Sequence, residues 1–154
     1  MMLSIIVPAC FENPLKRYAI NFLTEVLALR KRAVIPVTAI LGAYHIATKY
    51  LRAPRRVVKK ILVGILETRS PALYPQVAPM LVIDALDIAT TYNIESWDGY
   101  LVALAHSLGA KAIYTLDKGL KRIKEEIAIV NPFPLEKTRE YHQYIRTLLS
   151  REKR

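Results

Sequence analysis

The chain has 154 residues, of which 53% are apolar and 23% are charged, and its formal net charge is +10. This is enough chain for one domain with its own core, and the composition excludes a disordered, collagen-like or low-complexity protein. The single cysteine, Cys10, cannot form an internal disulfide.

The first half of the chain alternates short apolar runs with amphipathic segments. Residues 3–7 form a β-branched apolar run closed by Pro8, which predicts a buried strand. Asn13-Pro14 predicts a helix start, with Asn13 as the cap, and an apolar stripe then continues to Leu27. We further expect a strand at 33–36, helices at 38–49 and 54–68, and an irregular proline-containing stretch at 72–79.

The second half predicts three more helices and two more strands. A helix at 80–92 is followed by Ser96, a plausible cap for a helix at 97–108 that carries no charge after Asp98 and ends at Gly109. That helix should be buried. The remaining predicted elements are a strand at 112–116, a short helix at 118–125, a strand at 127–130 and a charged terminal helix at 136–152.

Strands that alternate with helices predict an α/β fold with a mainly parallel sheet and right-handed crossovers. Ligands of such sheets bind beyond the carboxyl ends of the strands. The positions of interest are therefore residues 8–12, 38–42, 96–98 and 115–118.

Charge is distributed unevenly along the chain. The net charge is +9 over residues 1–69, −4 over residues 70–110, which hold no Lys or Arg, and +5 over residues 111–154. The densest basic stretch runs from Lys49 to Lys60 and includes Arg52, Arg55, Arg56, Lys59 and Lys60. It is either a surface that contacts phosphates or the solvated side of two helices.

We expect a protein without membrane segments that works in the cytoplasm. The longest uncharged run, residues 33–48, has 16 residues and contains Pro36, whereas a spanning helix needs about 20 apolar residues. Gln occurs twice and Asn four times, and this scarcity of thermolabile side chains is typical of a thermophilic source.

Two acids mark the segment with the most specific pattern. Asp98 opens the buried helix in Ser96-Trp97-Asp98-Gly99, and Asp117 follows the next strand 19 residues later in a Thr-x-Asp pattern. This segment, with the later Asn131-Pro132, resembles the carboxyl-terminal half of PIN domains, the fold of many metal-dependent ribonucleases including the VapC-type toxins. The resemblance implies a three-layer α/β/α sandwich with a short, mainly parallel sheet of four to five strands.

The resemblance also implies the chemistry. PIN nucleases cluster about four acids that hold Mg²⁺ or Mn²⁺ for RNA hydrolysis. Asp98 and Asp117 fall on the third and fourth acidic positions, Thr115 falls on the hydroxyl of Thr-x-Asp, and Lys118 is placed to meet a phosphate. Pro8 and Gly42 stand where the family has its first two acids, and Glu12 is a candidate substitute. Three interpretations stay open: an endoribonuclease with a reduced acidic site, a non-catalytic PIN-fold module that binds RNA or a protein, or an active site rebuilt with Glu12 or with a residue from a second subunit.

Other polar and aromatic residues have simpler explanations. Asp84 and Asp87 share one helix face, either as an extension of the acidic patch or as a solvated face. Cys10 is expected to be a buried thiol. Tyrosines beside cations, as in Lys49-Tyr50, can stack on bases, but most of the nine fall at apolar helical positions and are expected in the core.

We expect residues 1–133 to form the PIN-like domain. Residues 134–154 are expected to form a helical extension that packs on the domain or on a second subunit. The expected partners are RNA, a second copy in a homodimer, and an antitoxin-like protein.

Overall fold

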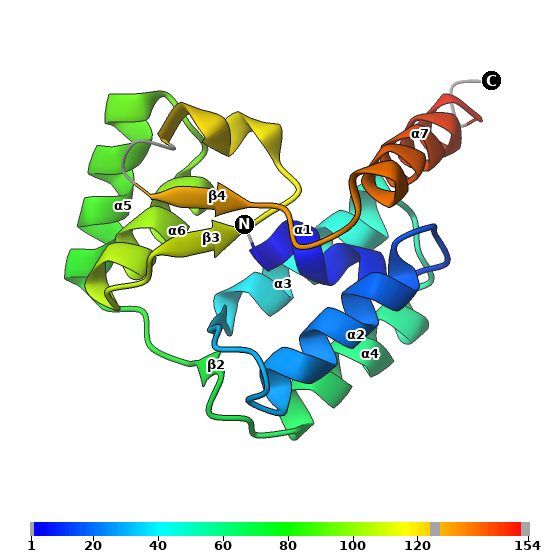
Figure 1. Ribbon diagram of the computed structural model, residues 1–154, viewed down its shortest axis with the longest axis horizontal. Helices are drawn as coiled ribbons and strands as arrows, with labels where there is room; N and C mark the ends of the chain where they lie inside the picture. Colours follow the sequence, from blue (N-terminus) through cyan, green and yellow to red (C-terminus); the bar gives the residue numbers. More distant parts are fainter. Residues whose placement is uncertain (1, 124–126, 152–154) are drawn as a thin grey trace. The chain divides into compact units, whose positions relative to one another are not determined.

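The computed structural model describes residues 2–123 and 127–151, which fall into two compact units (Figure 1). The N-terminal unit holds residues 3–75 and 132–151, and the central unit holds Met2 and residues 76–123 and 127–131. Each unit is described separately below.

The N-terminal unit is mostly helical and has one short strand pair. Its elements are α1 (Met2–Ile6), the 3₁₀ helix η1 (Val7–Cys10), α2 (Lys16–Leu27), β1 (Ile35–Pro36), α3 (Thr38–His45), the π-helical turn η2 (Ile46–Tyr50), α4 (Arg55–Glu67), β2 (Leu73–Tyr74) and α7 (Leu135–Arg151). Strands β1 and β2 pair in parallel, with Ile35 opposite Leu73. Helix α7 packs on this unit through Tyr141, whose ring centroid lies 6.5 Å from that of Phe11.

The central unit places two strands beside a helix pair. Its elements are α5 (Pro79–Tyr92), α6 (Ser96–Ser107), β3 (Ala112–Tyr114), the 3₁₀ helix η3 (Lys118–Ile123) and β4 (Ala128–Val130). Figure 1 shows α5 and α6 next to one another, and their backbones approach closely where Gly99 of α6 meets Ala85 of α5. Strands β3 and β4 pair in parallel, with Ala112 opposite Ala128.

The α/β class and the parallel pairing are confirmed. Within the described residues, however, the strands pair as two separate two-stranded ladders and not as one sheet of four to five strands. One reason is that the predicted first strand does not exist.

The prediction of a strand at residues 3–7 is wrong, because α1 and η1 cover this segment. Ile5 and Ile6 are fully buried, as is Pro8, and η1 packs on α2, α4 and η2. A strand among helices would need a neighbour to pair its N–H and C=O groups, whereas a helix pairs them internally. Pro8 fits because it lies in the first turn of η1, where its missing N–H costs no helical hydrogen bond.

Several predicted boundaries move by a few residues. The helix expected from Asn13-Pro14 begins at Lys16, and the helix expected at 38–49 changes from α to π geometry after His45. Ser96 is the first helical residue and not the cap, which is the extended Glu95. The helix expected at 118–125 is the 3₁₀ helix η3, and its last two expected residues lie outside the described residues, as does Glu152 at the end of the terminal helix.

The predicted end of the buried helix is confirmed at Gly109. This glycine has φ +64°, the left-handed conformation that favours glycine after a helix. Residues Asp98 to Ala105 of α6 are all buried, as the absence of charge after Asp98 predicts. Among the described residues, no helix is long and apolar enough to cross a membrane.

Candidate functional site

The first turn of α6 places Asp98 in the interior of the central unit. Helix α6 begins after the extended Glu95, and the Gly99 amide donates to the Glu95 carbonyl at 3.0 Å. Asp98 is only 4% exposed. The amino-terminal end of a helix favours a negative charge, which offsets part of the cost of burying this carboxylate.

One oxygen of the Asp98 carboxylate lacks the hydrogen bond that usually accompanies burial. Its Oδ1 atom has no hydrogen-bond partner among the described residues. Burial, and after it the nearby negative charge of Asp117, raise the pKa of Asp98 from 3.8 to about 6. A buried carboxylate with a second carboxylate nearby is a site that a cation would stabilise.

The turn after β3 positions Asp117. Thr115 is 2% exposed, and its amide donates to the Val130 carbonyl at 2.9 Å, so β4 anchors it. The Thr115 hydroxyl accepts the Asp117 amide at 2.9 Å, and Asp117 Oδ1 accepts the Gly119 amide at 2.7 Å. Asp117 and its neighbour Lys118 are exposed. One carboxylate is therefore buried while the other faces solvent.

These two carboxylates suit a hard divalent cation. Mg²⁺ is commonly held by one or two carboxylates and keeps several waters, and carboxylate oxygens suit Mn²⁺ as well. Among the described residues, no group of three or more His, Cys, Asp or Glu side chains could hold a metal ion. The arrangement thus fits a hydrated Mg²⁺ or Mn²⁺ and not a dehydrated structural metal.

A comparison with family models matches the PIN domain over residues 4–126, which is most of the chain. The chain belongs to the PIN domain family. Comparisons with curated proteins and with solved structures gave no match. A PIN domain has a nuclease-like fold, and such domains generally use divalent metals and commonly bind RNA.

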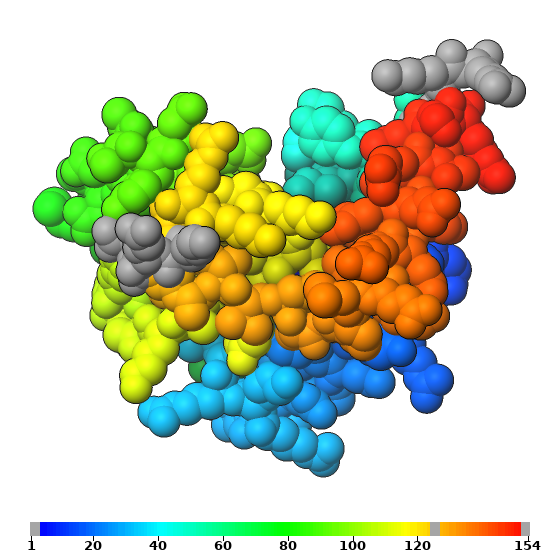
Figure 2. All heavy atoms as spheres, turned by 45° about the horizontal axis from the view of Figure 1, so that its top comes forward, coloured from blue at the N-terminus to red at the C-terminus, as the bar shows by residue number. Residues whose placement is uncertain are grey.

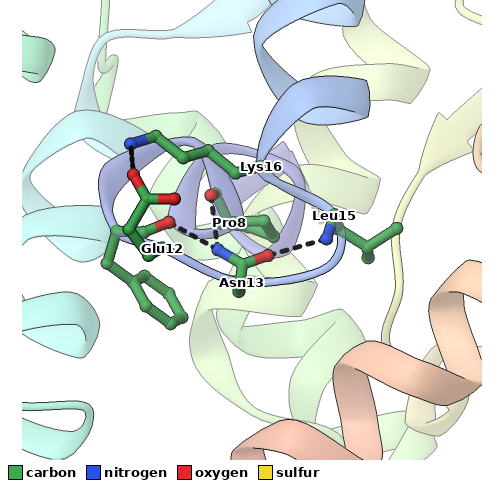
Figure 3. Close-up of polar contacts among 6 residues, drawn as sticks. Pro8, Glu12, Asn13, Leu15 and Lys16 are labelled. Atoms are coloured by element: carbon green, nitrogen blue, oxygen red, sulfur yellow. Dashed lines mark hydrogen bonds and ion pairs between the residues drawn. The ribbon is translucent and has the colours of Figure 1, made fainter.

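Pro8 and Gly42 of this PIN domain, which stand at the expected first and second acidic positions, are both buried in the N-terminal unit. Neither has a side chain that can bind a metal. Glu12 follows η1, but its side chain is 87% exposed and forms an ion pair with Lys16 (Figure 3). It is a solvent-facing residue of the turn that joins η1 to α2.

Asn13 holds this turn together through three hydrogen bonds (Figure 3). Its Nδ2 donates to the carbonyls of Pro8 at 2.8 Å and Phe11 at 2.7 Å, and its Oδ1 accepts the Leu15 amide at 2.9 Å. Asn13, which the sequence predicts as a helix cap, therefore stabilises the turn before α2 through its side-chain hydrogen bonds.

We expect Asn13→Ala to lower the free energy of unfolding by about 2–3 kcal/mol, because each lost hydrogen bond contributes about 1 kcal/mol. Asn13→Asp should cost at least as much, because its carboxylate has no N–H to donate and would face the carbonyl oxygens of Pro8 and Phe11. Urea denaturation followed by circular dichroism measures both. Equal stability of Asn13→Ala and the native chain would contradict this role.

The sequence-predicted site residues thus lie in two groups. Asp98, Thr115, Asp117 and Lys118 are in the central unit. The predicted phosphate contacts are in the N-terminal unit and are all exposed: Arg52, Arg55, Arg56, Lys59 and Lys60.

Other candidates have structural explanations. Asp84 and Asp87 are exposed on α5, as expected of a solvated face. Cys10 is fully buried, its Sγ donates to the Ile6 carbonyl at 3.6 Å, and burial raises the pKa of the thiol to about 12. The expectation of a buried thiol is confirmed.

Two glycines of the site were not singled out from the sequence. Gly99 allows the close approach of α6 to α5 beside Asp98, and Gly119 supplies the amide that binds Asp117. The available signals were Asp98-Gly99 at a helix start and the Asp-x-Gly spacing of a side-chain turn.

Proposed function

We propose that this PIN domain is an endoribonuclease that hydrolyses single-stranded RNA with Mg²⁺ or Mn²⁺ held by Asp98 and Asp117. The observation that supports it best is the buried Asp98 carboxylate. One of its oxygens has no hydrogen-bond partner among the described residues, and the negative charge of Asp117 helps to raise its pKa. A relationship to VapC-type toxins is part of this proposal.

Each of the four candidate site residues in the central unit has its own role in the proposed reaction. The chemistry that a bound Mg²⁺ or Mn²⁺ supplies is polarisation of the phosphodiester and a lower pKa of the attacking water. Asp98 offers its unpaired oxygen from the interior, and Asp117 offers a carboxylate on the solvent side. Thr115 is a positioning residue that fixes the Asp117 backbone, and the exposed Lys118 contacts a phosphate of the substrate.

The test is cleavage of a single-stranded RNA in the presence of Mn²⁺. We expect Asp117→Asn to lower the cleavage rate by about 100-fold or more, a usual cost of losing one preorganised group from a reacting site. A chelator should abolish cleavage. Asp87→Asn is the matched control, because Asp87 is an exposed acid of the same unit and should leave the rate unchanged.

If the native chain cleaves no faster than Asp117→Asn, the nuclease proposal is wrong. The second candidate function is then a non-catalytic PIN-fold module that binds RNA or a protein. The absence of a third acidic ligand among the described residues favours it. It predicts RNA binding that neither chelator nor Asp117→Asn alters.

The proposed protein partners are a second copy and an antitoxin-like protein. Helix α7 has exposed apolar side chains beyond Tyr141, including Tyr144 at 39% and Leu149 at 40% exposure, which a second copy could cover. Light scattering at micromolar concentration tests the dimer, and a monomeric mass would contradict it.

A further inference from the structure

Residues 26–66 form the longest stretch of the chain without an acidic residue. Between Glu25 and Glu67 there are nine Lys or Arg and no Asp or Glu. This stretch contains β1, α3, η2 and all of α4 except its last residue, Glu67. Side chains that could neutralise these cations are therefore missing from the stretch itself, and its surface attracts anions.

Tyr50 ends η2 within this basic stretch and is 55% exposed. It departs from the expectation that the tyrosines lie in the core, which Tyr100 and Tyr141 meet at 6% and 7% exposure. Figure 2 shows the side chains of this segment, in cyan, at the surface of the molecule. An aromatic ring left in water beside cations is an available stacking surface.

Two neighbours hold the Tyr50 ring in place. The His45 ring lies edge-on to it, with centroids 5.6 Å apart and an angle of 82° between the planes. The Lys49 ammonium lies 5.6 Å from the ring centroid. Tyr50 and Lys49 belong to the π-helical turn that follows α3, a distortion that is rare in helices and frequent at functional sites.

The chain then turns sharply into α4. Arg52 has φ +52°, a left-handed conformation that a side chain rarely adopts, and the Ala53 amide donates to the Ala47 carbonyl at 2.8 Å. Helix α4 begins five residues after Tyr50, and it is in contact with η2. Four cations lie on the solvent face of α4 and form no ion pair with a described residue: Arg55, Arg56, Lys59 and Lys60.

The position of these cations argues against a merely solubilising role. Arg55 and Arg56 occupy the first turn of α4, where the helix dipole disfavours positive charge. The apolar stripe of α4, at Val58, Leu62 and Ile65, is buried in the unit. A lipid surface would need such a stripe to be free, whereas phosphates need the cations and the helix amino terminus.

We propose that residues 45–60 form a binding surface for single-stranded polynucleotide, in which Tyr50 stacks on one unpaired base and α4 contacts the adjacent phosphates. This inference rests on the proposed function, because it names the surface that would bind the single-stranded RNA substrate. His45 and Lys49 are positioning residues for the Tyr50 ring. Binding at this surface needs no metal and can therefore be measured separately from cleavage.

The test is fluorescence anisotropy of a labelled single-stranded RNA bound by the full chain in excess chelator. We expect Tyr50→Ala to weaken binding about tenfold, within the usual range for the loss of one stacked base, and Tyr50→Phe to bind like the native chain. Tyr18→Ala, which removes an exposed tyrosine from α2 of the same unit, is the matched control and should bind normally.

Two further probes separate stacking from charge. An RNA duplex has no unpaired base, so Tyr50→Ala should leave its binding unchanged. Arg55→Ala should weaken both forms and lower the slope of log affinity against log salt concentration by about one. Tyr50→Ala should weaken the binding of single-stranded DNA by the same factor as that of single-stranded RNA. Whichever of the two the native chain binds more tightly identifies the natural polynucleotide.

Three results would overturn the proposal. They are native-like RNA binding by Tyr50→Ala, an equal loss for single strand and duplex, and tighter binding to vesicles of anionic phospholipid than to RNA. Asp117→Asn serves to separate the two proposals. If Asp117→Asn cleaves no RNA but binds RNA like the native chain, binding at residues 45–60 is independent of cleavage. If the native chain itself cleaves no RNA, the nuclease proposal fails, while the effect of Tyr50→Ala on binding still tests this surface.

Discussion

Replacing Asp98 by asparagine is expected to make the stability of the metal-free protein less dependent on pH. Above pH 6 the native chain carries a buried charge at Asp98, whose pKa is raised to about 6 by burial and by the charge of Asp117. In the unfolded chain the same carboxyl has its ordinary pKa of 3.8. The folded state therefore binds the proton more tightly than the unfolded state does.

The sign of the effect follows from this difference. A raised carboxyl pKa contributes stability that is fully present below pH 3.8 and is lost as the pH rises through 6. At about 1.4 kcal/mol per pKa unit, the loss is about 2–3 kcal/mol between pH 4 and pH 8. Asp98→Asn has no proton to lose, so its stability relative to the native chain should rise by that amount over the same interval.

Urea denaturation of both proteins in chelator at pH 4 and pH 8 measures this change. Asp84→Asn is the matched control, because the Asp84 carboxylate is exposed on α5 and water solvates it in both states. A constant difference between Asp98→Asn and the native chain at both pH values would contradict the buried, charged Asp98 described above.

The second large effect is expected from Gly99→Ala. A Cβ at Gly99 would collide with the carbonyl oxygen of Ala85 and would come within 3.1 Å of the Ala89 side chain. Because the collision is with backbone, α5 and α6 must move apart to relieve it. Overpacking of this kind costs about 1–3 kcal/mol and sometimes more, and we expect a loss of about 3 kcal/mol.

Gly64→Ala is the matched control for this prediction. Gly64 lies within α4, and nothing lies within 4 Å of the position that its Cβ would take. Alanine there should stabilise the helix by about 0.5–1 kcal/mol, because glycine loses more conformational freedom on folding. Thermal denaturation of the two variants should therefore shift the midpoint in opposite directions. A neutral Gly99→Ala would show that the helices are not in contact at this position.

The displacement of α6 has a functional consequence. Asp98 precedes Gly99, so any movement that relieves the collision also moves the carboxylate. We expect Gly99→Ala to lose the proposed Mn²⁺-dependent cleavage of single-stranded RNA even at temperatures where the variant is still folded.

The central unit was largely predictable from sequence because local signals agree there. The uncharged run after Asp98 predicts a buried helix, Gly109 predicts its end, and Thr-x-Asp after an apolar run predicts the turn that holds Asp117. Each of these features depends on residues close in sequence, so no distant partner decides the outcome.

The segment before Cys10 was mispredicted because its apolar residues have no period. A short run that is buried on all sides is compatible with a strand or a helix, and only the neighbours decide between them. Here the neighbours of η1 are helices and offer no strand to pair with. For Tyr50 the sequence leaves two interpretations open, a core position on a helix or a ring beside Lys49 that stacks on bases. The structure leaves its side chain exposed at the end of the π-helical turn.

The sequence also could not predict that Asp98 and Asp117 differ in burial, or that the pKa of Asp98 is raised. Asp98 and Asp117 have the same side chain and each stands next to a helix start, yet one is buried and the other exposed. The pKa shift of Asp98 comes from burial and from a charge 19 residues away in the chain, and both depend on how α6 packs beside β3.

The central claim is that Asp98 and Asp117 together hold one divalent cation. Electron paramagnetic resonance tests it most directly, because the spectrum of free Mn²⁺ loses intensity when the ion binds a protein. We expect the native chain to bind one Mn²⁺ and both Asp98→Asn and Asp117→Asn to bind at least about tenfold more weakly, as carboxylates dominate Mn²⁺ affinity at such sites. Equal Mn²⁺ binding by the three proteins, or none by the native chain, would contradict the account.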